Sequence, residues 1–310
     1  MTTPILRIGT RGSPLALAQT NMVRDRLAAA HPDLAIPGAI EVIIIKTTGD
    51  IVLDRPLAEI GGKGLFTKEI DEAMLEGRVD LAVHSMKDVA TVLPDGIVLP
   101  CMLPREDPRD AFLCLKARSL ADLPAGAVIG TSSLRRGAQI LHRRPDLKVA
   151  PLRGNVQTRL RRLEEGVVDA TLLALAGLKR LGLADQATAV LATEDLLPAV
   201  AQGAVGITCR DGDGAALERL APLSHADTVR CVEAERAFLT VLDGSCRTPI
   251  AGLAEITGDG SLWFRGMIVQ PDGRDLHFAE RRGAVDAAVA LACDAAHDLL
   301  ARSRAGGGGG

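Results

Sequence analysis

The sequence predicts an α/β fold, and three observations support this prediction. Short apolar segments of strand length alternate with helix-length segments through the first two thirds of the chain. Such alternation is typical of α/β domains with a parallel sheet. The chain has 310 residues, so two or three domains are expected. From about His225 the pattern changes to a helix, three strands and a helix, which indicates a separate small α+β domain.

The first α/β segment occupies the N-terminal hundred residues. Ser13 is a good N-cap and Pro14 suits the first helical position, so a helix is expected to begin there and to run to about Ala30. A second helix is expected from about Leu65 to Glu76. The predicted strands are Ile5–Gly9, Val42–Lys46 and Asp80–His84.

A long glycine-containing loop, Thr47–Gly64, interrupts this segment and ends in Gly61-Gly62-Lys63-Gly64. Loops of this length inside a compact domain are usually functional. The loop lacks the spacing of a phosphate-binding P-loop, so we interpret it as a flexible lid.

The segment Pro100–Pro108 contains three prolines and is interpreted as a crossing between domains. A second α/β segment follows it, with one helix capped by Thr131-Ser132-Ser133 and another opened by Gly154-Asn155. A linker containing Pro198 is expected to return the chain to the first domain. The predicted strands are Ala127–Gly130, Lys148–Leu152, Ala170–Leu175, Thr188–Thr193 and Ala204–Cys209.

The last segment is expected to form the α+β domain. Its predicted elements are a helix at Asp227–Leu242, strands at Ile250–Ile256, Leu262–Val269 and Leu276–Ala279, and a final helix of alanines and leucines.

Composition excludes several classes of protein. The net charge is −3 and aromatic residues make up 2% of the chain, so neither a general attraction to polyanions nor a base-stacking platform is expected. No apolar run reaches the roughly 18 residues that cross a membrane, and the N-terminus lacks a signal-peptide core. The six cysteines form no C-x-x-C pair, so a cytoplasmic location without a metal site is expected.

Arginines are concentrated in the second segment. Between Thr131 and Arg162 there are eight arginines and one acidic residue, Asp146. Arg135 and Arg136 lie in the first turn of a helix, and Arg153 follows a strand, as Arg11 does in the first segment. Helix N-termini and arginine forks bind carboxylate or phosphate oxygens, so these four predict an anion site. A solvated basic face or a nucleic-acid patch remains the alternative, and it is favoured for Arg143, Arg144, Arg161 and Arg162.

Two further features suggest chemistry. Lys87-Asp88 follows a predicted strand, where the carboxylate could stabilise a developing cation or move a proton, although a surface ion pair is equally compatible. Cys246 lies beside Arg247 in a glycine-containing loop and could be a reactive thiolate, although such cysteines are more often incidental.

Taken together, these segments resemble the porphobilinogen deaminase family over essentially the whole chain. The matching stretches begin Arg7-Ile8-Gly9-Thr10-Arg11-Gly12-Ser13-Pro14-Leu15-Ala16, Gly61-Gly62-Lys63-Gly64-Leu65-Phe66-Thr67-Lys68-Glu69 and Ala82-Val83-His84-Ser85-Met86-Lys87-Asp88. They continue with Gly130-Thr131-Ser132-Ser133-Leu134-Arg135-Arg136, Leu152-Arg153-Gly154-Asn155-Val156, Ala176-Gly177-Leu178-Lys179-Arg180-Leu181-Gly182 and Gly244-Ser245-Cys246. So many ordered motifs make a chance match negligible.

The resemblance implies a monomer with two doubly wound domains like type II periplasmic binding proteins and a small α+β C-terminal domain. It implies that the enzyme joins four porphobilinogen molecules head to tail, with release of ammonia, to give hydroxymethylbilane. It also implies a dipyrromethane cofactor attached through a thioether to Cys246. The implied boundaries are residues 1–103 with 203–221 for domain 1, 109–197 for domain 2, 226–305 for domain 3, and 306–310 for a disordered tail.

The resemblance also assigns roles to residues. Asp88 is the implied catalytic carboxylate, which helps protonate the departing amine and then stabilises the azafulvenium cation. The implied cofactor contacts, besides Cys246, are Ser85, Lys87, Thr131, Ser133, Arg135, Arg136, Arg153, Gly154 and Asn155. The implied substrate contacts are Arg11, Ser13, Gln19, Arg153, Arg159, Arg180 and Gln202. Lys63 and Phe66 are implied to end the lid. Ala90 and Ser245 depart from the family pattern of a proline and a glycine, but neither change removes a functional group.

Two other functions compete with this prediction. A two-lobed anion-binding module would explain the arginines, but it would not explain Cys246 or the Lys87-Asp88 pair. A nucleic-acid-binding protein is disfavoured by the negative net charge and the scarcity of aromatic residues.

Overall fold

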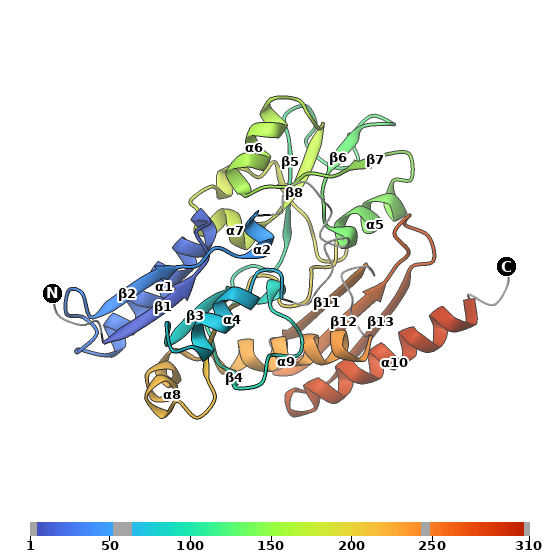
Figure 1. The fold of residues 1–310 in the computed structure, drawn as a ribbon. Helices are drawn as coiled ribbons and strands as arrows, with labels where there is room; N and C mark the ends of the chain where they lie inside the picture. The colour runs from blue at the N-terminus through green and yellow to red at the C-terminus, as the bar shows by residue number, and fades with distance from the viewer. Residues whose placement is uncertain (1–4, 52–63, 243–248, 307–310) are drawn as a thin grey trace. The chain divides into compact units, whose positions relative to one another are not determined.

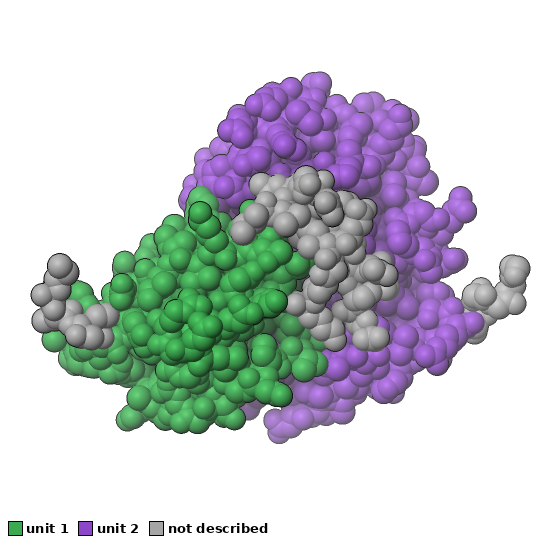
Figure 2. Space-filling view, in the orientation of Figure 1, with its two compact units in different colours: residues 1–55, 60–106, 204–229 green, residues 56–59, 107–203, 230–310 purple. Residues whose placement is uncertain are grey.

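The computed structural model describes residues 5–51, 64–242 and 249–306. The chain divides into two compact units (Figures 1 and 2). The described residues of unit 1, green in Figure 2, lie within 5–51, 64–106 and 204–229. Those of unit 2, purple in the same figure, lie within 107–203 and 230–306.

Unit 1 contains a five-stranded sheet with the strand order β2-β1-β3-β10-β4. The strands are β1 (Leu6–Thr10), β2 (Ile40–Ile44), β3 (Leu81–Ser85), β4 (Ile97–Met102) and β10 (Val205–Arg210). The helices are α1 (Pro14–Ala30), α2 (Thr48–Ile51), α4 (Lys68–Leu75) and α8 (Gly214–Leu220), with 3-10 turns η1 (Met86–Asp88) and η3 (Ala221–Leu223). Helix α9 (Ala226–Val241) begins in unit 1 and continues into unit 2.

The two faces of this sheet are covered by different helices. Leu81 and Val83 of β3 belong to one buried cluster with Val23 and Leu27 of α1. Ala82, which points to the opposite face, packs instead with Ile70 and Met74 of α4, among others. The sheet is therefore buried on both faces, as in doubly wound folds.

The sheet of unit 1 is mixed, whereas a parallel sheet was expected. β1 runs parallel to β2 and β3, but β10 is antiparallel to both β3 and β4. The strand predicted at Ala204–Cys209 does return to this sheet as β10. It enters from a distant part of the chain rather than through a local helical crossover, and so it can run in either direction.

Unit 2 contains a second mixed five-stranded sheet, with the order β7-β6-β8-β5-β9. Its strands are β5 (Asp110–Cys114), β6 (Val128–Gly130), β7 (Lys148–Ala150), β8 (Ala170–Ala174) and β9 (Ala189–Val190). Its helices are α5 (Leu134–Arg143), α6 (Val156–Glu164) and α7 (Leu175–Arg180), with η2 (Ala184–Gln186). Phe112 packs on the face that contacts Ile140 of α5, and Leu113 on the face that contacts Leu178 of α7.

The remaining part of unit 2 is a three-stranded antiparallel sheet with helices on one face (Figure 1). The strands are β11 (Ile250–Ile256), β12 (Ser261–Ile268) and β13 (His277–Ala284), followed by η4 (Val285–Ala287) and α10 (Ala288–Gly306). Phe238 of α9 and Leu299 of α10 pack against Phe264. On the other face, Met267 packs with Ala138 of α5. The predicted α/β class with an added small α+β part is confirmed.

Three expectations about elements were wrong. β4 was not predicted, because it overlaps the proline-containing segment Pro100–Pro108 that was interpreted as a crossing between domains, and β5, which follows this segment, was not predicted either. The strand expected at Thr188–Thr193 is reduced to the two residues of β9. The segment interpreted as an uninterrupted loop, Thr47–Gly64, begins with the short helix α2.

Candidate functional site

In unit 1, several predicted site residues gather at one edge of the sheet. Arg11 and Ser13 follow β1, and Ser85 ends β3, which is parallel to β1. Parallel strands end at the same edge, where ligands of open α/β sheets bind. The Ser13 hydroxyl caps α1 by accepting from the Ala16 N–H (3.3 Å).

Gln19 on α1 fixes the end of β3. Its Nε2 donates to the Ser85 hydroxyl (2.9 Å), and this hydroxyl donates in turn to the Gln19 Oε1 (3.1 Å). Gln19 is buried. Two residues assigned to different roles, substrate and cofactor binding, thus contact each other directly.

Lys87 and Asp88 lie in the turn η1 directly after β3. Met86, which begins this turn, is buried, and its N–H donates to the Ala204 carbonyl (3.1 Å). Lys87 is exposed and Asp88 is partly exposed. The turn is therefore anchored while both charged side chains remain accessible, as proton transfer to a substrate requires.

In unit 2, the second group of predicted residues lies at the corresponding edge. β6 is parallel to both β7 and β8, so the segments that follow these strands lie at one edge. Ser133 caps α5 by accepting from the Arg136 N–H (3.4 Å), and Thr131 accepts from the Ser133 N–H (3.1 Å). Asn155 caps α6 by accepting from the Thr158 N–H (2.9 Å).

The arginines that follow these strands are directed by backbone carbonyls. Arg159 donates through Nε to the Gly154 carbonyl (2.9 Å), and Arg180 donates through Nη2 to the Gly203 carbonyl (2.6 Å). Gly154 has a φ of +111°, and an added Cβ would lie 2.7 Å from the Thr158 side chain. Glycine is thus required between Arg153 and the Asn155 cap.

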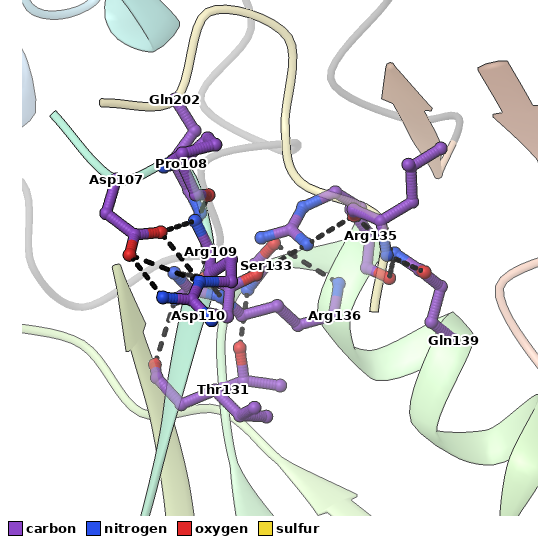
Figure 3. A network of polar contacts seen from close by, with 12 residues as sticks. Asp107, Pro108, Arg109, Asp110, Thr131, Ser133, Arg135, Arg136, Gln139 and Gln202 are labelled. Carbon is purple, nitrogen blue, oxygen red and sulfur yellow. Dashed lines mark hydrogen bonds and ion pairs between the residues drawn. The ribbon is translucent and has the colours of Figure 1, made fainter. Parts of the chain in front are cut away.

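A buried aspartate that the sequence analysis did not single out organises Arg135 and Arg136 (Figure 3). Asp110 is the first residue of β5, which runs antiparallel to β8, so it lies at the same edge as the carboxyl end of β8. Its Oδ1 accepts from Arg136 Nη2 (2.7 Å) and Nε (3.1 Å), and its Oδ2 pairs with Arg135 Nη1 (2.8 Å). Gln202 Nε2 donates to the same Oδ1 (3.0 Å).

The Asp110 cluster, meaning Asp110 with Arg135 and Arg136, is almost free of water contact. Asp110 is 0% exposed and the arginines are 6% and 5% exposed. Burial alone would raise the pKa of Asp110, but the two guanidinium groups reverse this effect and hold the pKa below its ordinary value. The carboxylate is therefore ionised, and the cluster carries one net positive charge.

The cluster offers unused hydrogen-bond donors. Within the described residues, Arg135 Nε and Ser132 Oγ are buried and have no hydrogen-bond partner. Arg136, in contrast, donates to Asp110 and to the Leu172 carbonyl (2.9 Å). One positive charge with free donors at a helix N-terminus suits a ligand carboxylate.

Two other arginines of the basic segment make surface contacts. Arg161 pairs with Glu165 (3.8 Å) and Arg143 with Asp195 (3.4 Å), with exposed side chains in both pairs. These contacts agree with the solvated-surface interpretation of Arg143 and Arg161. Arg144 differs, because it is 22% exposed and donates to the backbone carbonyls of Leu120, Ala121 and Leu123 as well as to Asp146 (2.7 Å).

Two predicted functional residues, Cys246 and Lys63, lie outside the described residues, as do residues 307–310 of the glycine tail. Two acidic residues that pair with predicted ligand-binding arginines, Asp110 and Asp50, were not predicted from the sequence. The apolar run Ala111–Cys114 after Asp110 was an available signal for a strand, and it would have placed this carboxylate at the sheet edge.

Two family models match the sequence of this chain. The family model "Porphobilinogen deaminase, dipyromethane cofactor binding domain" matches residues 6–218. A second, "Porphobilinogen deaminase, C-terminal domain", matches residues 229–301. The chain belongs to the porphobilinogen deaminase family.

Close relatives cover nearly the whole chain. A porphobilinogen deaminase from rice, described as chloroplastic, is 60% identical over 97% of this chain and 85% of its own length. One from Nitrobacter winogradskyi is 56% identical over 96% of this chain and 93% of its own. The chain therefore has the porphobilinogen deaminase (hydroxymethylbilane synthase) activity of tetrapyrrole biosynthesis, with porphobilinogen as substrate, and it contains a dipyrromethane cofactor binding domain.

Among solved structures, the methionine binding protein MetQ is similar over 72% of this chain and 91% of its own, with 15% identity and a TM-score of 0.44. Within the described part of the chain, no helix is long and apolar enough to span a membrane.

We expect Asp110→Ala to destabilise unit 2 strongly, because it leaves two guanidinium groups buried without their counter-charge. The free energy of unfolding should fall by about 3–5 kcal/mol, as measured by chemical denaturation. Asp195→Ala, which removes the partner of Arg143 in an exposed pair, is the control and should change little. Similar losses in the two variants would contradict the assigned importance of Asp110.

His84 provides a pH-dependent prediction. It is buried and contacts Thr208 (3.0 Å), and burial, assisted by the charge of Arg11, lowers its pKa to about 4. The unfolded chain binds this proton near pH 6.5 while the native protein does not, so stability should fall as the pH drops below 6.5. The loss between pH 7.5 and 5 should be about 2 kcal/mol, and should be smaller in His84→Asn. An NMR titration of the ring with a midpoint near 6.5 would contradict this prediction.

Proposed function

We propose that Asp88 is the catalytic carboxylate of this enzyme. Its support is its position: η1 places Asp88 at the carboxyl edge of β3, beside the strand that leads to Arg11 and Ser13. An anchored turn presents its side chain to solvent. In this role, Asp88 assists the proton transfer that lets ammonia leave porphobilinogen, and its charge then stabilises the resulting cation.

We further propose that the strand-end arginines hold the acetate and propionate groups of the pyrroles. The observation that carries this proposal is the net positive charge of the buried Asp110 cluster with the free Nε of Arg135. A pyrrole carboxylate bound at the N-terminus of α5 would neutralise this charge. The residues proposed for the cofactor are Ser85, Lys87, Thr131, Ser133, Arg135, Arg136, Arg153, Gly154 and Asn155. Those proposed for the substrate are Arg11, Ser13, Gln19, Arg153, Arg159, Arg180 and Gln202.

The dipyrromethane group, attached to Cys246 in this proposal, supplies the pyrrole carbon to which the first porphobilinogen is joined. The residues described above fit its chemistry, because its carboxylates need cationic donors and its N–H groups need an acceptor such as Asp88. The residues of the chain bind and orient these groups, and Asp88 holds or moves the proton.

We also propose that the enzyme is a cytoplasmic monomer of three domains. Domain 2 (109–197) lies within unit 2, as does domain 3 (226–305) from Arg230 onward. In this proposal Lys63 and Phe66 lie at the end of a lid. The C-terminal part of the chain has its own sheet and its own core, built on Phe238 and Phe264, and this supports its assignment as a domain. A non-catalytic anion-binding module is less well supported, since such a module has no use for the accessible Asp88.

The proposed covalent attachment of the cofactor predicts an increase in the intact mass of the enzyme. The intact purified enzyme should be heavier than its sequence by one dipyrromethane, and peptide mapping should place the addition on Cys246. Cys246→Ser should lack it, while Cys293→Ser, which changes a partly exposed cysteine, should retain it. Active enzyme with the bare sequence mass would overturn the proposal.

The role of Asp88 predicts that Asp88→Asn folds normally and retains the covalent cofactor but turns over slowly. Loss of a positioned acid–base group typically costs roughly 10²–10⁴ in rate, so kcat should fall by about this factor. Steady-state kinetics with intact mass as the loading control test this, and turnover near that of the wild type would exclude the role.

A further inference from the structure

Two side chains of unit 1, Asp50 and Phe66, contact the guanidinium group of Arg11. Arg11 Nε lies 3.1 Å from both carboxylate oxygens of Asp50, and its Nη2 also contacts Asp50 Oδ1. Asp50 therefore occupies one edge of the guanidinium group, formed by Nε and Nη2. Both side chains are about three-quarters buried, with 23% and 27% exposed.

Phe66 contacts the same guanidinium group. The Arg11 Cζ lies 4.2 Å from the centre of the Phe66 ring, which is a cation–π contact. The ring also packs on Gly49, where an added Cβ would lie only 2.2 Å from it. Because Gly49 has no side chain, the backbone next to Asp50 can lie against the Phe66 ring that contacts Arg11.

Further hydrogen bonds hold α2, and with it Asp50, in place. Thr47 Oγ1 donates to Asp50 Oδ2 (2.8 Å), and the Thr48 N–H donates to Glu69 Oε1 (2.9 Å), which ties α2 to α4. The Gly49 N–H donates to the Leu65 carbonyl (2.8 Å). Burial would raise the pKa of Asp50, but hydrogen bonds from Arg11 and Thr47 lower it below its ordinary value, so the carboxylate is charged.

One edge of the Arg11 group stays available. Within the described residues, Nη1 has no partner, and the Nη1/Nη2 edge is the second of the two edges on which a guanidinium group binds a carboxylate. The Asp50 and Phe66 contacts restrict rotation of the side chain about its own bonds. The direction of this free edge is therefore set before a ligand arrives.

We propose that Asp50 and Phe66 are positioning residues, which hold the Arg11 guanidinium group so that its Nη1/Nη2 edge receives one carboxylate of porphobilinogen. This inference rests on the proposed substrate role of Arg11. Its physical basis is that a free arginine side chain loses much rotational entropy on binding, and fixing it in advance removes that cost. Asp50 and Phe66 need not touch the substrate.

The competing interpretation is that Asp50 is a rival of the substrate, because its carboxylate binds the same guanidinium group. The two interpretations differ for two substitutions. Asp50→Asn would lower KM if Asp50 competes with the substrate, and would raise KM if Asp50 positions Arg11. Phe66→Leu removes the ring without changing any charge, so competition between Asp50 and the substrate gives no reason for it to raise KM, whereas loss of positioning does.

The experiment is steady-state kinetics of the holoenzyme with porphobilinogen. We expect Asp50→Asn and Phe66→Leu each to raise KM roughly tenfold, with kcat changed less than about twofold. Intact mass and thermal midpoint should show a loaded, folded enzyme. The control is Asp33→Asn, which breaks another aspartate–arginine pair of unit 1, with Arg219 (3.1 Å), and should leave KM unchanged.

A double-mutant cycle separates positioning from general structural damage. If Asp50 acts through Arg11, Asp50→Asn should add little to the KM of Arg11→Lys, whereas structural damage would add in full. A lowered KM in Asp50→Asn, or an unchanged KM in Phe66→Leu, would overturn the positioning role while leaving the role of Arg11 intact. An unchanged KM in Arg11→Lys would instead refute the proposed role of Arg11, and the positioning inference with it.

Discussion

Two guanidinium groups of like charge lie next to each other in the interior of unit 2, and a single carboxylate makes this arrangement stable. Removing an ion from water costs several kcal/mol even in a real protein interior. Asp110 repays part of this cost for both Arg135 and Arg136, and the carbonyls of Leu172 and Leu197 accept further donors. Because these partners come from different elements, the N-terminus of α5 is tied to β5, β8 and the segment before Gln202. The Asp110 cluster thus both holds these elements together and gives this part of unit 2 its positive charge.

An arginine is also paired with an internal aspartate in unit 1, but there one aspartate faces one arginine instead of two. Arg11 is paired with Asp50, but this pair is partly exposed and is completed by an aromatic ring instead of a second arginine. A ligand with many carboxylates calls for many arginines, and unpaired arginines would repel one another and lose their orientation. Internal aspartates reduce the repulsion by lowering the local charge, and they hold the guanidinium groups in one orientation. The remaining N–H donors then have defined directions toward a ligand. The Asp110 cluster thus keeps one net positive charge and the Arg11–Asp50 pair keeps none, in a chain whose overall net charge is −3.

The positions of the site residues at strand ends could be predicted from the sequence, because caps such as Ser133 and Asn155 and the order of strands and helices are local signals. The aspartates could not. Asp110 is important because β5 pairs with β8, about sixty positions further along the chain, and this pairing leaves no local signal. Asp50 lies in a four-residue helix that depends on contacts with Glu69 and Leu65, so the glycine-rich composition suggested only a loop. Strand direction also escaped prediction, since β10 enters its sheet from a distant segment.

The placement of β10 has a consequence for how the protein forms on the ribosome. β10 lies between β3 and β4 in the sheet of unit 1, yet more than one hundred residues, including a complete second sheet, are synthesised between β4 and β10. Unit 1 is the first to be synthesised, but its sheet cannot be completed before β10 has been made. The facing edges of β3 and β4 stay unpaired until residue 210 has left the ribosome. Unpaired edges favour aggregation. Nascent chains of this enzyme therefore expose two unpaired strand edges while the residues between β4 and β10 are synthesised.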